Sequence, residues 1–91
     1  MTSTDPHRSR LLVLVSAECN ECRRATRIAA EFGEQAPEVD VRVVDITLEP
    51  VPDGVILVGT PMYIDDTMEP TVLSLGNPAP AQLAHHYGTD R

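Results

Sequence analysis

The pattern of apolar and polar positions predicts a strand followed by a helix in the first third of the chain. Residues 11–16, "LLVLVS", form an almost continuous apolar run, which is typical of a strand buried on both faces. After a short polar segment, apolar residues recur at helical spacing and form one stripe, made of Ala25, Ile28, Ala29 and Phe32. Pro37 should end this helix, because the residue before a proline avoids the helical conformation.

A second strand is predicted over residues 39–46, "VDVRVVDI", where valines alternate with charged residues. Strand, helix and strand follow one another within about 35 residues, which is the length of a βαβ unit. The two strands should therefore be parallel neighbours, with a right-handed crossover through the helix.

The segment of residues 47–60 is punctuated by proline and glycine and should be irregular. Pro50 and Pro52 make this part of the chain too rich in proline for a helix. The apolar stretch "VILVG", residues 55–59, is predicted to be either a strand or a short buried connection.

The last third of the chain is predicted to form a hairpin and a helix. The hairpin joins "MYIDD" (62–66) to "TVLSLG" (71–76) through a polar turn. In the following "NPAPAQLAHHYG", Asn77 would be the N-cap, Pro78 the first helical residue and Gly88 the end of the helix. The residues expected to face the sheet are Leu83, Ala84 and Tyr87.

Together these elements predict an α/β fold in the order β-α-β-loop-β-β-α. The four-stranded sheet would be mixed, with a parallel pair first and an antiparallel pair last, and helices would cover it. With 91 residues, the chain should hold one domain, over residues 11–88. Residues 1–10 are interpreted as a polar N-terminal tail and residues 89–91 as a C-terminal tail.

Charge and hydropathy narrow the function classes. The formal net charge is −7, and the 7 residues counted as Lys or Arg are all arginine. An acidic surface repels phosphate backbones, so no nucleic-acid partner is expected. No stretch is long enough to cross a membrane, and the apolar run of residues 11–15 is shorter than the core of a signal peptide. The expected location is the cytoplasm, with no membrane partner.

Two cysteines, Cys19 and Cys22, lie at the predicted junction between the first strand and the helix. The unpaired N–H groups and the positive end of a helix stabilise a thiolate. A cysteine at the cap position, here Cys19, should therefore have a lowered pKa. Cys22 would lie on the first turn and on the same side. Cys19 would be the exposed nucleophile, and Cys22 would resolve the mixed disulfide that Cys19 forms.

Other interpretations of the cysteine pair remain open. A structural disulfide across so small a loop gains little stability from loop entropy and would not persist in a reducing compartment. A zinc site needs four ligands, whereas the chain has two cysteines and three histidines, His7, His85 and His86. The last two are consecutive, so their side chains would not face the same way on a helix. A third alternative is a metal ion bound between the CxxC pairs of two chains. A fourth is a cysteine pair that is packed and unreactive.

Two segments resemble the thioredoxin-like superfamily. One is the strand-"CNEC"-helix arrangement, and the other is "VGTPMYIDD", residues 58–66, which is similar to the proline loop of thiol-disulfide oxidoreductases. The resemblance extends over about residues 11–88. It implies that Pro61 is cis and packs beside the disulfide, which leaves the backbone of Thr60 to pair with an extended substrate segment.

The function that this resemblance implies is that of a small thiol-disulfide oxidoreductase. Its catalytic residues would be Cys19 and Cys22, and Thr60 and Pro61 would bind the substrate. It would need no bound cofactor and no metal, because electrons would come from a reductase partner and pass to a protein disulfide substrate.

Departures from the family pattern keep two alternative functions open. No tryptophan precedes Cys19, and the dipeptide Asn20-Glu21 is not that of thioredoxin or glutaredoxin. The missing tryptophan and the acidic surface favour a thioredoxin-like binding or adaptor module with vestigial or regulatory cysteines. The other alternative is a carrier that holds a metal ion through the CxxC dithiolate.

Overall fold

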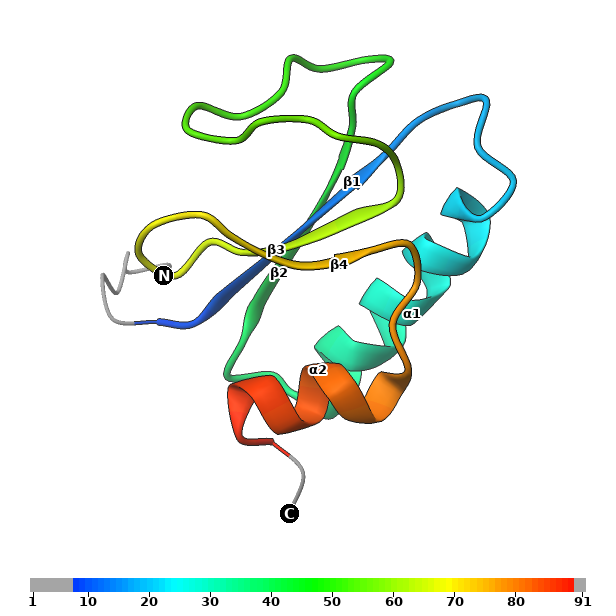
Figure 1. Cartoon of the computed structure of the whole chain (residues 1–91). Helices are drawn as coiled ribbons and strands as arrows, with labels where there is room; N and C mark the ends of the chain where they lie inside the picture. The colour runs from blue at the N-terminus through cyan, green and yellow to red at the C-terminus, as the bar shows by residue number, and fades with distance from the viewer. Residues whose placement is uncertain (1–7, 90–91) are drawn as a thin grey trace, which may run out of the picture.

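The structure is a computed structural model that describes residues 8–89 of the chain. In chain order, its elements are β1 (Arg10–Val15), α1 (Cys22–Gln35), β2 (Asp40–Asp45), β3 (Met62–Asp65), β4 (Thr71–Leu75) and α2 (Pro80–Tyr87), as Figure 1 shows. This order confirms the predicted α/β fold, including the long loop between β2 and β3.

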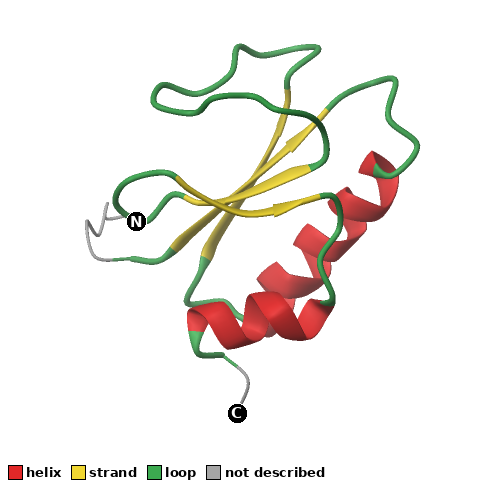
Figure 2. Ribbon diagram, in the orientation of Figure 1, coloured by secondary structure: helices red, strands yellow, loops and turns green. Residues whose placement is uncertain are grey.

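The four strands form one mixed sheet in the order β2-β1-β3-β4. Strand β1 is parallel to β2 and antiparallel to β3, which is in turn antiparallel to β4. The predicted parallel first pair and antiparallel hairpin are therefore confirmed, and the topology is thioredoxin-like. In Figures 1 and 2 the β1–α1 connection and the β2–β3 loop lie at the same end of the sheet.

Both helices pack on one face of the sheet. The side chains on that face of β1, from Leu11, Val13 and Val15, share a core with the α1 stripe and with Leu83 of α2. The stripe is buried at Ala25, Ala29 and Phe32, as its helical spacing predicts. The rings of Phe32 and Tyr87 lie 5.7 Å apart and join the two helices.

The opposite face of the sheet is covered by a loop, because residues 47–60 form no helix. Leu12, Leu14, Val44, Met62 and Ile64 make a second core there, and the loop adds Ile46, Val51 and Val55. Since β1 contributes to both cores, its continuous apolar run is explained. The prediction for "VILVG" was wrong, because this stretch is not a strand and, after the partly buried Val55, it is exposed: Ile56 is 82% exposed and Val58 is 68% exposed.

Helix α2 begins later than predicted. Its N-cap is Ala79 and its first residue is Pro80, so Asn77 and Pro78 lie outside the helix. The reason is local, since Ala79 precedes a proline and is held extended, with φ −66° and ψ 142°. The predicted end is confirmed at Gly88, which has a φ of 68° in the left-handed region that favours glycine.

The predicted tails fall largely outside the described residues. Strand β1 begins at Arg10, so the last residue assigned to the N-terminal tail belongs to the sheet. Residues 1–7, including His7, and residues 90–91 are not described. Among the helices of residues 8–89, neither is long and apolar enough to span a bilayer.

Candidate redox site

A disulfide joins Cys19 to Cys22 in the segment that leads from β1 into α1, with the two Cα atoms 5.3 Å apart. Cys22 is the first residue of the helix, is only 5% exposed, and belongs to the core beneath it. Cys19 is partly exposed and packs against the same core from outside. The structure therefore places the CxxC pair at the helix start, as the sequence predicts, with Cys19 partly exposed and Cys22 buried.

The helix cap is displaced from its predicted position, because the N-cap is Glu21 and not Cys19. The backbone N–H of Cys22 donates to the carbonyl of Cys19 at 3.2 Å, so the disulfide loop is a closed turn that precedes the helix. Within residues 8–89, the backbone N–H groups of Arg23 and Arg24 have no hydrogen-bond acceptor. The positive helix end therefore still faces the disulfide loop.

Ser16, the residue after β1, links the disulfide to the proline loop. Its backbone N–H donates to Sγ of Cys22 at 3.5 Å, and its Oγ lies 2.8 Å from Oγ1 of Thr60. The Thr60–Pro61 peptide bond is cis, as the resemblance implies, and the Pro61 carbonyl accepts from the N–H of Gly76 at 2.8 Å. The two sequence segments that carried the resemblance are thus brought to one end of the sheet.

Asn77 closes another side of the site. Its Nδ2 donates to the carbonyl oxygen and to Oε2 of Glu21, at 3.1 and 3.2 Å. Its Oδ1 accepts from the hydroxyl of Tyr63 at 2.8 Å. Burial raises the pKa of Tyr63 to about 12, against a smaller opposing effect of the Arg24 charge, so this hydroxyl stays protonated and donates. Sequence reasoning missed this role because it assigned Asn77 to a helix cap.

The accessible side of the disulfide opens to a hollow of about 440 Å³. It is lined by Ala17, Glu18, Cys19, Asn20 and Arg23. The carboxylate of Glu18 and the guanidinium of Arg23 give this hollow charges of both signs. A second sulfur can therefore approach Cys19 from solvent on this side.

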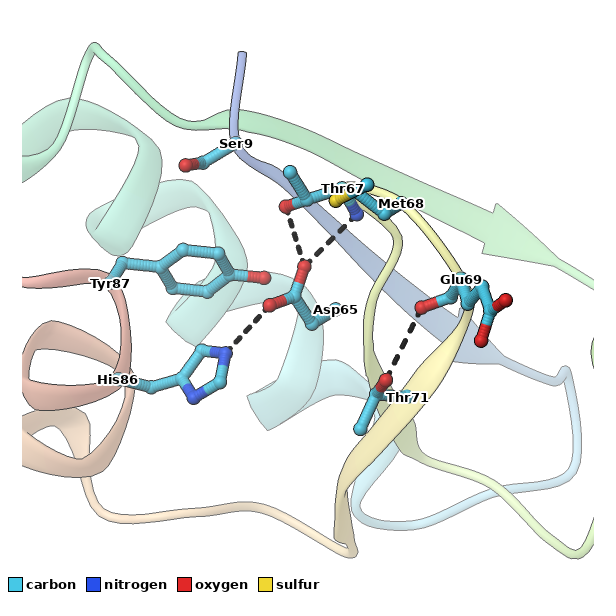
Figure 3. A pocket seen from close by; sticks show the side chains of 8 residues that line it. All are labelled: Ser9, Asp65, Thr67, Met68, Glu69, Thr71, His86 and Tyr87. Atoms are coloured by element: carbon cyan, nitrogen blue, oxygen red, sulfur yellow. Dashed lines mark hydrogen bonds and ion pairs between the residues drawn. The ribbon is translucent and has the colours of Figure 1, made fainter. Parts of the chain in front are cut away.

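A second polar cluster lies at the other end of β3, around Asp65 and His86 (Figure 3). His86 Nε2 is 2.7 Å from Oδ2 of Asp65, whose Oδ1 accepts from the backbone N–H of Thr67 at 3.0 Å and from its hydroxyl at 2.6 Å. Burial alone would raise the pKa of the Asp65 carboxyl, but the hydrogen bonds from Thr67 and His86 outweigh it and hold the pKa below its ordinary value.

This cluster borders a hollow of about 590 Å³, and its contacts fit a structural role. Tyr87 donates to the carbonyl of Arg10 at 2.7 Å, and the N–H of Arg10 donates to Thr67 Oγ1 at 3.0 Å. With Asp65 and His86, these bonds fasten the start of β1, the end of β3 and α2 to one another. Both carboxylate oxygens of Asp65 are thus hydrogen-bonded to groups of the fold itself.

Metal ligands do not gather in the described part of the chain: no group of three or more His, Cys, Asp or Glu residues within 8–89 could hold a metal ion. Cys19 and Cys22 are bonded to each other, and His86 is paired with Asp65. His7 lies outside the described residues.

Comparison with known proteins adds no family assignment: no protein-family model matches the sequence, and no curated protein is significantly similar to it.

Proposed function

We propose that this protein is a thiol-disulfide oxidoreductase of the thioredoxin-like kind. The observation that carries the proposal is the asymmetric disulfide at the start of α1, between the partly exposed Cys19 and the 5% exposed Cys22. A purely structural disulfide needs no such asymmetry, whereas disulfide exchange needs one sulfur open to a substrate and one shielded from it.

In the reduced protein, the thiolate of Cys19 attacks one sulfur of a substrate disulfide. The first substrate sulfur is the one that is not attacked: it leaves as a thiolate and takes up a proton, while the second, attacked sulfur forms a mixed disulfide with Cys19. Cys22 then loses its proton and attacks Sγ of Cys19, which releases the second substrate sulfur as a thiol. The substrate gains two electrons and two protons, and the protein ends with the Cys19–Cys22 disulfide. A reductase partner restores the dithiol by the reverse exchange, so no bound cofactor is needed.

The surroundings of each sulfur support this division of roles. The N–H groups at the first turn of α1 favour the thiolate of a cysteine facing them. Cys22 Sγ accepts from the backbone N–H of Ser16 and lies within the core, where a bulky substrate has no access. Cys22 therefore meets only the sulfur of Cys19, three residues away.

The proposed substrate is a protein disulfide in an extended segment that docks along Thr60 and Pro61. Within the described chain, the backbone of residues 56–60 makes no hydrogen bond, so its N–H and C=O groups are open to a strand-like partner. The exposed side chains of Ile56 and Val58 would contact apolar side chains of that segment. A reaction of this kind belongs in a reducing compartment such as the cytoplasm, which has the required reductases.

A redox titration tests this function. The protein is equilibrated in dithiothreitol or glutathione buffers of stepped potential, and free thiols are alkylated and counted by mass. We expect one two-electron transition at a potential between about −300 and −120 mV. A disulfide that stays oxidised below this range in folded protein would instead be structural, and the proposal would be wrong.

The alternative of a binding module is favoured by one observation, the exposed apolar side chains of Ile56, Val58 and Leu75 around the loop-covered face. For an adaptor, replacing both cysteines by serine leaves partner binding intact. For the oxidoreductase, the same double substitution abolishes disulfide exchange, which separates the two functions.

A further inference from the structure

We infer that Asn77 is a positioning residue for the redox pair: it holds the carboxylate of Glu21 away from Cys19 and thereby preserves the stability of the Cys19 thiolate. This role of Asn77 matters only if the proposed function holds. The evidence for it is the set of hydrogen bonds that join Glu21, Asn77 and Tyr63.

The amide of Asn77 has only one orientation that satisfies its neighbours. The raised pKa of Tyr63 keeps its hydroxyl protonated as a donor, and this hydroxyl meets Oδ1 at 2.8 Å. The carbonyl and carboxylate of Glu21 only accept hydrogen bonds, and both meet Nδ2. A flip of the amide would place oxygen against oxygen on the Glu21 side. The hydrogen bonds that join Tyr63, Asn77 and Glu21 are called the clamp below. Because Tyr63 is fully buried, one end of the clamp lies in the core.

The clamp acts on a charge next to the thiols. Glu21 lies between Asn20 and Cys22, and it is the N-cap of α1, yet its side chain makes no capping hydrogen bond. Its carboxylate is directed to Asn77 and is absent from the lining of the hollow at Cys19. The Glu21 carboxylate therefore does not occupy the unpaired N–H groups of Arg23 and Arg24 at the helix start.

Loss of the Asn77 amide would release the Glu21 carboxylate. A free carboxylate at the N-cap can accept hydrogen bonds from the first-turn N–H groups, where it would compete with the thiolate. It would also repel the thiolate directly, because like charges disfavour ionisation. Both effects raise the pKa of Cys19.

The test is a pH titration of the Cys19 thiolate by its ultraviolet absorbance, in full-length protein that carries Cys22→Ser so that one thiol titrates. We expect Asn77→Ala to raise the pKa of Cys19 by roughly half to one unit. In protein that also carries Glu21→Gln, the same substitution should shift this pKa by less than about a third of that amount, because no carboxylate is left to release.

The matched control is Gln82→Ala. Gln82 is another amide near the start of α2, where its Oε1 accepts from the N–H of Ala79 at 2.9 Å, but it does not contact Glu21. A purely structural loosening of this region would move the Cys19 pKa in both variants, whereas the clamp predicts a shift for Asn77→Ala alone. Circular dichroism reports whether each variant is folded. If Asn77→Ala is not, Asn77→Leu keeps the approximate volume of the side chain without adding a charge, and should raise the pKa in the same direction.

The inference is overturned if the folded Asn77 variants leave the Cys19 pKa unchanged, if Gln82→Ala shifts it equally, or if the Asn77→Ala shift survives in full beside Glu21→Gln. This titration uses neither substrate nor reductase. Its outcome is therefore independent of the redox titration that tests the proposed function, and either proposal can fail alone.

Discussion

Ser16 and Thr60 meet across the redox site, with their hydroxyl oxygens 2.8 Å apart. Ser16 follows β1 and contacts the sulfur of Cys22 through its backbone N–H, while Thr60 precedes the proline that leads into β3. One side chain contact thus fixes the proposed substrate-binding loop relative to the buried sulfur. Nothing in the local sequence around either residue indicates this pairing, because 44 positions separate them.

Ser16→Ala removes this contact and keeps the backbone bond to Cys22. A net hydrogen bond is worth about 1 kcal/mol, so we expect kcat/KM for a protein disulfide substrate to fall about fivefold. Reduction of the disulfide by dithiothreitol, which does not use the Thr60 loop, should change by less than about twofold. The isosteric Thr60→Val should match Ser16→Ala, and the double variant should be no worse than either alone. Additive losses would show that the two hydroxyls act separately.

Phe32→Ala should destabilise the domain severely. Phe32 is 5% exposed, lies in the core between the sheet and the two helices, and contacts the ring of Tyr87. Truncation of such a side chain costs about 3–5 kcal/mol, which is a large share of the stability of a small domain. Urea unfolding followed by circular dichroism measures the loss. Gln35→Ala, at the exposed end of the same helix, should stay within about 0.5 kcal/mol of the parent protein.

Asp65 should make the domain sensitive to acid. Its folded-state pKa is lowered, so its contribution to stability is complete above the ordinary carboxyl pKa and is lost as the pH falls through the folded-state pKa. We expect the stability difference between the parent protein and Asp65→Asn to shrink as the pH falls from about 5 toward about 2. Urea unfolding across this range provides the measurement.

Thr67→Ala gives a graded version of the same experiment. It removes the hydroxyl that donates to Asp65 Oδ1 but keeps the backbone N–H and the His86 bond. The Asp65 pKa should then move back toward its ordinary value, and the acid loss should begin at higher pH than in the parent protein. If stability falls with acid at the same pH in the parent protein, in Asp65→Asn and in Thr67→Ala, then Asp65 does not govern the acid sensitivity.

The elements of the fold could be predicted because their residues follow clear periods. The run from Leu11, the stripe that ends at Phe32 and the two segments of the hairpin all form the expected elements, at boundaries within three residues of those predicted. The stretch "VILVG" could not be assigned in this way. Its apolar residues indicated a strand or burial, but the Pro-rich loop covers the sheet with Val51 and Val55 and leaves Ile56 and Val58 exposed.

The candidate site was predictable only in part. The position of Cys19 and Cys22 at the start of α1 follows from local sequence, whereas the partner of Asn77 is Glu21, 56 positions away. Local pattern could not distinguish a cap from this tertiary contact, because an Asn before a proline fits both. Only the second proline of "NPAP", Pro80, marks the true start of α2.

Trapping the mixed disulfide tests directly whether Cys19 is the sulfur that attacks a substrate. Reduced Cys22→Ser and Cys19→Ser proteins are each mixed with a protein disulfide substrate, and the products are separated without reductant and weighed by mass spectrometry. The expected result is that Cys22→Ser accumulates a covalent complex through Cys19, while Cys19→Ser forms none, because the side chain of Cys22 lies in the core. A complex formed equally by both variants, or by neither while both remain folded, would contradict it.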